Sequence, residues 1–225
     1  MAEERLLSHE ELATLCEQRA QGYAWIARLF KEEVDEALLA GLKATEYPQG
    51  TGNDNLDLGY RKIATYLSCA ASGVLLELAV DYARVFIGHR NDTFGAAYPF
   101  ESVYTSEKRL LMQEARNEVV AIYRKSGMAI DDSWKDPEDH VALELEYMRV
   151  MAEKAADALR GGEADKALGC LRDQQAFLDG RLRLWVPMLT EDMKRFAKTE
   201  FYQGLAYLLD GFLQVDSEFF ADVLA

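Results

Sequence analysis

The stretch DPEDHVALELEYM, residues 136–148, holds the side chains of this sequence that could do chemistry. His140 and Glu144 are four residues apart, and Glu138 and Asp139 come directly before them. A group of this composition can bind a metal ion, transfer a proton, cap a helix or recognise a cationic partner. The stretch by itself leaves these four uses open.

Metal binding and acid–base catalysis need more groups than the stretch provides. A metal site needs three or four converging ligands, and His140 and Glu144 supply two. The sequence has no HExxH motif, and the other histidines, His9 and His89, have no cysteine close to them. Asp139 and His140 are adjacent, so on a helix their side chains point about 100° apart. We therefore expect no metal ion, no catalytic residue and no cofactor.

Helix capping accounts for most of the acidic residues. Asp136 suits the N-cap position and Pro137 suits the first helical turn. Glu138 and Asp139 place negative charge where the helix dipole is positive. The residues alone favour capping first and recognition of a partner second.

A helix over residues 136–160 has two distinct sides. Its expected core stripe consists of Val141, Leu145, Met148, Ala152 and Leu159. The residues His140, Glu144 and Met151 fall at the edge of that stripe. Asp139 falls on the opposite side, in a column with Leu143 and Val150. Apolar residues in that column predict a groove or a partner on this side.

The composition of the whole chain restricts its class. The 225 residues are enough for one domain, 1–225, with a substantial core. Lys and Arg number 25 and Asp and Glu 39, which gives a formal net charge of −14. This charge opposes nucleic acid and anionic membranes. We expect no nucleic-acid partner.

The cysteines and the N-terminal residues indicate the compartment. The three cysteines, Cys16, Cys69 and Cys170, are far apart and form no CxxC pair. The N-terminal sequence MAEERLLSHEE lacks the cationic start and apolar run of a secretory signal. No run reaches the roughly 18 apolar residues of a membrane span. We expect a cytoplasmic protein without a membrane span.

The spacing of apolar residues is helical along the chain and predicts an all-α bundle of about ten helices. Ser8 and Glu11 form a capping box before a long first helix, and a second helix is expected over 32–42. The stretch TEYPQGTGNDNLDLG, residues 45–59, gathers Pro, Gly and Asn and predicts a loop.

Two later stretches carry specific expectations. The stretch GVLLELAVDYARVFIG, residues 73–88, is apolar nearly all round, which predicts a helix at the centre of the bundle that ends at Gly88. Pro187 is expected to kink or break the helix that contains it.

Several motifs in order along the chain resemble those of the TorD/DmsD/NarJ-type cytoplasmic chaperones. They are DYARVFIG (81–88), YPFESVY (98–104), PEDHVALELEYM (137–148), FLDGRLRLWVP (177–187) and EFYQGLAYLLDGFL (200–213). The resemblance covers about residues 75–215. It departs from the family's pattern at Arg181, where the family often has histidine, so any role of that side chain is in doubt.

The resemblance implies a function that composition does not provide. Such chaperones bind the twin-arginine signal peptide or the apo form of a molybdenum-cofactor oxidoreductase and assist its maturation before export. The implied contact residues are Pro137, Asp139 and His140, with Tyr98, Pro99, Glu101 and Tyr104 in the same region. The implied fold is TorD-like, as a monomer or as a domain-swapped homodimer with a hinge in the loop 88–102.

The chemistry of a twin-arginine leader agrees with these residues. A leader joins two arginines to an apolar, helix-prone segment, so its binder needs carboxylates beside an apolar groove. Asp139, Glu101 and Glu144 are the expected carboxylates. The expected groove residues are Tyr98, Phe100, Tyr104, Leu143 and Val150.

Two alternative functions stay open. One is a small helical metal-dependent hydrolase built on His140 and Glu144. The other is an adaptor chaperone for a client that is not exported. A client is the protein that a chaperone assists.

Overall fold

The computed structural model describes residues 7–69, 72–88 and 95–224, and this part of the chain is all-α. Its helices are α1 (His9–Lys31), α2 (Glu36–Ala44), α3 (Asp54–Cys69), α4 (Val74–Tyr82), α5 (Glu101–Thr105), α6 (Glu114–Lys125), α7 (Val141–Arg160), α8 (Ala164–Phe177), α9 (Arg183–Phe196) and α10 (Glu200–Val223). Two π-helical segments, η1 (Ala83–Ile87) and η2 (Leu178–Leu182), follow α4 and α8. The described residues form no strand and one isolated bridge, between Phe100 and His140. The predicted fold class is confirmed.

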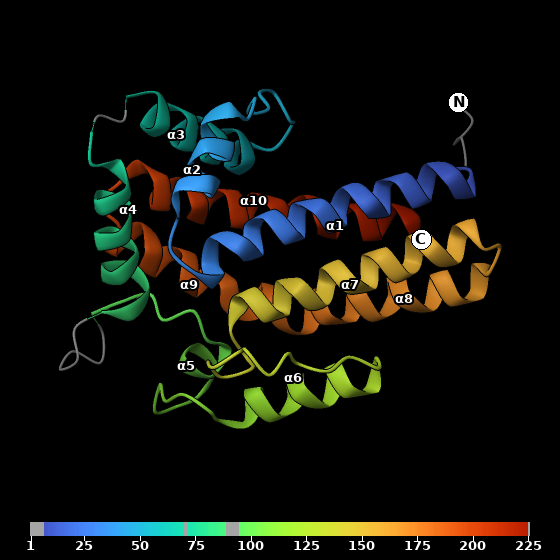
Figure 1. Ribbon diagram of the computed structural model, residues 1–225. Helices are drawn as coiled ribbons and strands as arrows, with labels where there is room; N and C mark the ends of the chain where they lie inside the picture. The colour runs from blue at the N-terminus through green and yellow to red at the C-terminus, as the bar shows by residue number, and fades with distance from the viewer. Residues whose placement is uncertain (1–6, 70–71, 89–94, 225) are drawn as a thin grey trace.

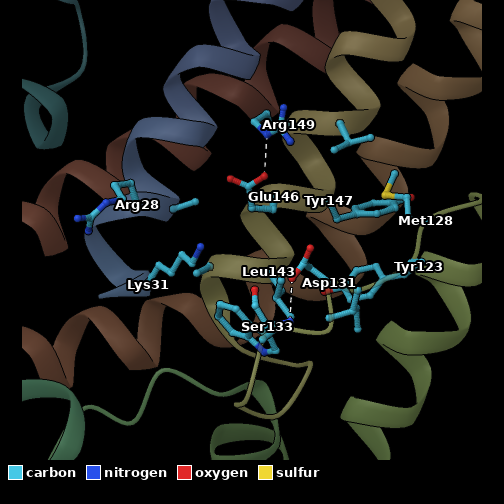
Figure 2. A pocket seen from close by; sticks show the side chains of 16 residues that line it. Arg28, Lys31, Tyr123, Met128, Asp131, Ser133, Leu143, Glu146, Tyr147 and Arg149 are labelled. Carbon is cyan, nitrogen blue, oxygen red and sulfur yellow. Dashed lines mark hydrogen bonds and ion pairs between the residues drawn. The ribbon is translucent and has the colours of Figure 1, made fainter. Parts of the chain in front are cut away.

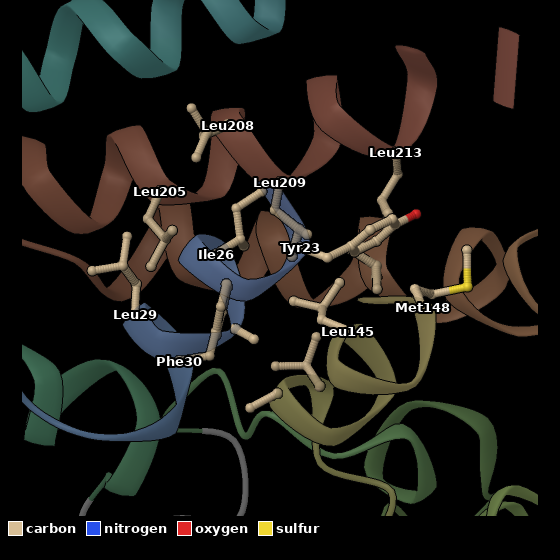
Figure 3. Close-up of a cluster of buried hydrophobic side chains, with 14 of the residues drawn as sticks. Tyr23, Ile26, Leu29, Phe30, Leu145, Met148, Leu205, Leu208, Leu209 and Leu213 are labelled. Carbon is tan, nitrogen blue, oxygen red and sulfur yellow. The ribbon is translucent and has the colours of Figure 1, made fainter. Parts of the chain in front are cut away.

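The long helices form the body of the molecule. Helix α1 packs along α7, α8 packs on α7, and α3 packs along α10. Figure 1 shows α1 between α10 and α7, with α5 and α6 below them and α4 at one edge. Side chains from α1, α7 and α10 meet in the core, where each fully buried large side chain contributes about 1.5–3 kcal/mol. Figure 3 shows this cluster, which includes Tyr23, Ile26, Phe30, Leu145, Met148, Leu205 and Leu209.

Local sequence explains how several helices begin and pack. The Ser8 hydroxyl accepts a hydrogen bond from the Glu11 amide (3.2 Å), and the Glu11 carboxylate accepts one from the Ser8 amide (2.8 Å), so the predicted capping box is present. Helices α3 and α10 touch through their backbones: a Cβ at Gly59 would lie 2.7 Å from the Leu208 amide nitrogen. Any side chain at Gly59 would push these two helices apart.

Helix α4 corrects one prediction. It lies at the edge of the molecule (Figure 1), and the side chains of Leu76 and Val80 are 70% and 49% exposed. The apolar pattern of residues 73–88 suggested a central helix, but its outer face has no partner among the described residues. The buried acid of this helix, Asp81, accepts hydrogen bonds from the amides of Lys198 (3.1 Å) and Thr199 (2.7 Å). It thereby fixes the turn before α10.

The prediction that Pro187 breaks its helix is wrong, whereas a kink at this residue stays a prediction. Helix α9 continues through Pro187 to Phe196. The π-helical segment η2 comes directly before α9, and a π turn changes the hydrogen-bond register of the helix there. Proline therefore lies inside the helix without ending it.

The remaining organisational predictions have different outcomes. Gly88 ends η1 with a positive φ of 68°, as predicted. The hinge proposed for the loop 88–102 falls partly on residues 89–94, which lie outside the described residues, and a single domain stays a prediction. None of the helices in the described ranges is both long and apolar enough to cross a bilayer.

Candidate functional site

The start of α7 differs from the prediction. The helix begins at Val141 and its N-cap is His140, whose Nδ1 accepts a hydrogen bond from the Ala142 amide (3.0 Å). Asp136 is exposed and lies outside the helix, so it is not the cap. The reason is a contact between distant segments: the Val141 amide donates to the Pro99 carbonyl (2.9 Å), and the Glu101 amide donates to the Asp139 carbonyl (2.9 Å). This pairing holds the chain extended up to His140.

Asp139 also differs from the prediction, because its side chain is fully buried. Its Oδ2 accepts hydrogen bonds from the amide (2.8 Å) and the hydroxyl of Ser102. Ser102 is the second residue of α5, so the carboxylate caps this short helix from another segment. The helical projection placed Asp139 on an outer face because it assumed that residue 139 was already helical. Asp139 is a structural residue of the corner between α5 and α7.

The His140 ring is buried between two aromatic rings. Its centroid lies 5.0 Å from that of Phe100 and 5.3 Å from that of Trp134, both in edge-to-face geometry. Burial lowers the pKa of His140 to about 3, so the ring is neutral near pH 7. With Nδ1 used by the Ala142 amide, His140 is not arranged with Glu144 as a ligand pair, and the described residues contain no group of three candidate metal ligands.

Glu101 and Glu144 lie behind this corner, together with Arg181. Glu144 is fully buried and its Oε2 accepts a hydrogen bond from the Trp185 indole N–H (3.0 Å). The Glu101 Oε2 lies 3.3 Å from Arg181 Nε, and the same guanidinium donates to the exposed Glu118 (2.6 Å). Glu101 is therefore matched by an internal arginine and is not open to solvent, contrary to the prediction that it faces a partner.

The pKa values of the two glutamates follow from this burial. The pKa of Glu144 is raised well above its usual range, first by burial and then by repulsion from Glu101. The pKa of Glu101 is also raised by burial, although the Arg181 guanidinium opposes the shift. Burial thus opposes the ionisation of Glu144 more strongly than that of Glu101.

The aromatic residues expected in the groove do not lie together in the structure. Pro99 and Phe100 are buried in the pairing with residues 139–141, and Tyr98 is half-buried. Tyr104 instead stacks on Trp185, with centroids 5.8 Å apart, and its hydroxyl donates to Asp192 of α9 (3.2 Å). Tyr104 therefore faces α9 and does not lie with His140.

A cavity of about 670 Å³ lies beside the corner, between α1, α7 and the segment 128–134. Leu143 and Val150 line it, as the column on α7 predicted. Its other lining residues are Ala27, Arg28, Lys31, Tyr123, Met128, Ala129, Ile130, Asp131, Ser133, Trp134, Ala142, Glu146, Tyr147 and Arg149. Figure 2 shows Arg28 and Lys31 on the α1 side, opposite Tyr123 and Met128. Pockets of this size and composition accept apolar groups of a ligand.

Two arginines at the edge of the cavity, Arg28 and Arg149, are held in ion pairs. Glu146 Oε2 accepts from Arg149 Nε (2.7 Å), and Arg28 is paired with Asp35 (2.9 Å). Asp131 accepts from the Ser133 amide (2.8 Å), and its pKa is lowered by the hydrogen bonds from Ser133. Asp131 is therefore ionised near pH 7 and exposed. It is a carboxylate that a cationic group can reach.

The sequence prediction missed the part of the cavity that comes from α1 and from residues 128–134. Trp134 was the available signal, because a tryptophan within the polar run DDSWKD is unexpected on a solvated loop. The contribution of Arg28 and Lys31 had no local signal, since it depends on how α1 packs on α7.

Comparisons with known proteins agree with this geometry. The sequence model of the family described as "Nitrate reductase delta subunit" matches residues 53–191. The chain is 28% identical to "Chaperone protein TorD" of Vibrio parahaemolyticus over 216 residues, which are 93% of this chain and 98% of the relative. It is 27% identical to the protein of the same name from Vibrio cholerae over 213 residues, with 92% and 94% covered. For Photobacterium profundum the identity is 25% over 218 residues, with 93% and 97% covered.

The class defined by the fold and these matches is that of the all-α chaperones that mature redox enzymes. The chain belongs to the nitrate reductase delta subunit family, which is the family of TorD/NarJ-type chaperones. It is therefore a chaperone and not an enzyme.

Proposed function

We propose that this chain binds the twin-arginine leader peptide of a molybdenum-cofactor oxidoreductase and assists its maturation before export. The leader would lie in the cavity between α1, α7 and residues 128–134. The observation that supports this most directly is the combination of an apolar, aromatic lining with an exposed, ionised carboxylate at Asp131. Family membership supports a redox-enzyme client.

The leader's two parts match two parts of the cavity. Its apolar segment fits the wall made by Leu143, Trp134 and Tyr147. Its arginines would pair with Asp131 and would replace Arg149 in the ion pair with Glu146. Such exchange costs little because ion pairs in contact with water contribute only about 0–1 kcal/mol, and this pair is partly exposed.

The buried residues of the corner act by positioning this cavity. His140 holds the Trp134 ring through their edge-to-face contact. Asp139 holds α5, and Pro99 accepts from the first amide of α7. We therefore infer that Pro99, Asp139 and His140 affect leader binding through the shape of the wall, without touching the leader's arginines.

Calorimetric titration of a leader peptide tests the apolar part of the proposal. Leu143→Glu places a charge on the wall and should weaken binding at least about tenfold, a cost of about 1.4 kcal/mol. Leu76→Glu on α4 is the matched control, because Leu76 is an exposed leucine away from the cavity, and it should leave affinity unchanged. If the wild type binds the peptide and both variants bind it equally well, the cavity is not the site.

The same titration with a twin-lysine peptide tests the charged part. Lysine cannot form the two parallel hydrogen bonds of a guanidinium with a carboxylate, so it should bind the wild type more weakly. Asp131→Asn should reduce the difference between the two peptides, whereas its neighbour Asp132→Asn should preserve it. Wild-type protein that binds neither peptide would refute leader recognition itself, and a client that is not exported would then be the better hypothesis.

A further inference from the structure

The cluster behind the corner has more buried acids than cations. Glu144 and Asp139 are fully buried and Glu101 is 4% exposed, whereas Arg181 is the one cation whose ion pair reaches them among the described residues. These groups come from α7, from the segment before α7, from α5 and from η2. The cluster therefore joins the four elements that build the corner.

The carboxyl oxygens of this cluster are not all matched by donors. Glu144 Oε2 accepts from Trp185, but Glu144 Oε1 and Glu101 Oε2 accept no hydrogen bond from an N–H or hydroxyl group of the described residues. Glu101 and Glu144 are close enough for Glu101 to oppose the ionisation of Glu144 by charge repulsion. Two neighbouring buried carboxyl groups cannot both be ionised at low cost, whereas a proton on one of them can be donated to the other. Such a proton between α5 and α7 would satisfy the two oxygens that have no donor.

Arg181 cannot replace that proton. Its Nε lies 3.3 Å from Glu101 Oε2 without a well-formed hydrogen bond, and its two terminal nitrogens donate to Glu118 on α6. A single guanidinium divided between two carboxylates has no charge left for a third. If Glu144 were ionised, it would be an uncompensated buried charge next to Asp139 and Glu101.

We propose that the proton shared by Glu101 and Glu144 fastens α5 to α7, and that its loss at high pH loosens the corner and weakens leader binding. The second half of this inference rests on the proposed function. The groups that face Glu144 are Glu101 from α5, Asp139 from the preceding segment, Arg181 from η2, Tyr123 from α6 and the Trp185 indole from α9. Tyr123 is neutral up to high pH because burial raises its pKa well above 10.

The link from this proton to the cavity runs through α5. Phe100, at the N-cap of α5, packs its ring on His140, and His140 packs on Trp134 in the cavity wall. Repulsion between two ionised glutamates would move α5 away from α7 and release the support of that wall. Lower affinity at high pH is the expected result.

Titration of an N-acetylated leader peptide at pH 6 and pH 9 tests the inference. Arginine keeps its charge over this range, so the peptide's own arginines do not titrate. Wild-type affinity should fall at least about fivefold, roughly 1 kcal/mol, between the two values. Glu144→Gln should change less than twofold, because a glutamine amide donates to Glu101 and its oxygen still accepts from Trp185. Glu153→Gln, on the exposed side of α7, should behave as wild type.

The indole ¹⁵N–¹H signal of Trp185 gives a readout that does not depend on the peptide. It should shift with pH in the wild type as Glu144 loses its proton, and stay constant in Glu144→Gln. If Glu144→Gln does not fold, Glu101→Gln serves the same purpose. Equal pH dependence of affinity in wild type and variant, with a Trp185 signal that does not move, overturns the inference. If no peptide binds at any pH, the proposed function fails, and the Trp185 signal alone decides on the shared proton.

Discussion

Two buried charged networks in this molecule differ in their balance of charge. The first lies between α1, α8 and α10: Arg19 donates to both oxygens of Asp216 and, through Nη2, to Gln174 Oε1 (2.9 Å). Tyr23 also donates to Asp216, and the guanidinium carbon lies 4.2 Å from the centre of the Phe219 ring. The second is the cluster of Glu101, Asp139, Glu144 and Arg181 at the corner.

The difference between the networks lies in how completely the acids are matched. Asp216 faces one cation and accepts hydrogen bonds on both oxygens, so its charge is fully compensated. Glu144 shares its surroundings with two other acids and must keep a proton. Replacing an acid by its amide should therefore have opposite effects on the free energy of unfolding in the two networks.

The largest effect is expected for Asp216→Asn. The substitution leaves the buried Arg19 without a counter-charge, and breaking a buried pair in this way costs about 3–5 kcal/mol. Urea denaturation of the variant should show the loss as a lower midpoint with an unchanged slope. Asp222→Asn, at an exposed position of the same helix, is the control and should stay within about 0.5 kcal/mol of wild type. A midpoint for Asp216→Asn close to that of the control would mean that the network is not a stabilising pair.

A smaller loss is expected for Asp139→Ala in the corner. The two hydrogen bonds from Ser102 would be lost, and the buried amide and hydroxyl would remain unmatched, at a cost of about 1–3 kcal/mol. Asp136→Ala is the matched comparison, since Asp136 is exposed and caps no helix in this structure. It should be neutral within about 0.5 kcal/mol. If thermal or urea unfolding instead ranks Asp136→Ala as the more damaging change, the helix begins at 137 as the sequence suggested.

This pair of substitutions also shows what the sequence could predict. The Ser8 and Glu11 capping box and the core stripe of Val141, Leu145 and Met148 depend on residues a few positions apart, and both were predicted correctly. The start of α7 depends on hydrogen bonds from residues 139–141 to residues 99–101, about 40 positions away in the chain. No local pattern contains that pairing.

The candidate site, like the helix starts, was predicted only where it depends on residues close together in the sequence. The column of Leu143 and Val150 indicated a groove on α7, and both residues line the cavity. The opposite wall, with Arg28 and Lys31 from α1, requires knowledge of how α1 packs on α7. Glu101 and Asp139 have the side chains that would bind arginine, but burial determines what a carboxylate can reach, and burial is a property of the whole fold.

The effect that is smallest at low pH, and opposite in sign above it, is expected for Glu144→Gln. Below pH 4.5 Glu144 is protonated in the folded and in the unfolded chain, so an amide that donates to Glu101 and accepts from Trp185 should change stability little there. The folded-state pKa is raised above the usual value of 4.5, so above pH 4.5 the folded protein keeps a proton that the unfolded chain has released. The contribution of this group to stability is therefore complete below pH 4.5 and is lost as pH rises towards the folded-state pKa. Glutamine has no proton to lose, so Glu144→Gln should become progressively more stable than wild type as pH rises above 4.5, and the difference should level off above the folded-state pKa. Urea unfolding at pH 5, 7 and 9 measures this trend, with Glu153→Gln as the exposed control on the same helix. A variant that is less stable than wild type at every pH would show that Glu144 is ionised in the folded protein, and that the corner, like the Asp216 network, is a compensated pair.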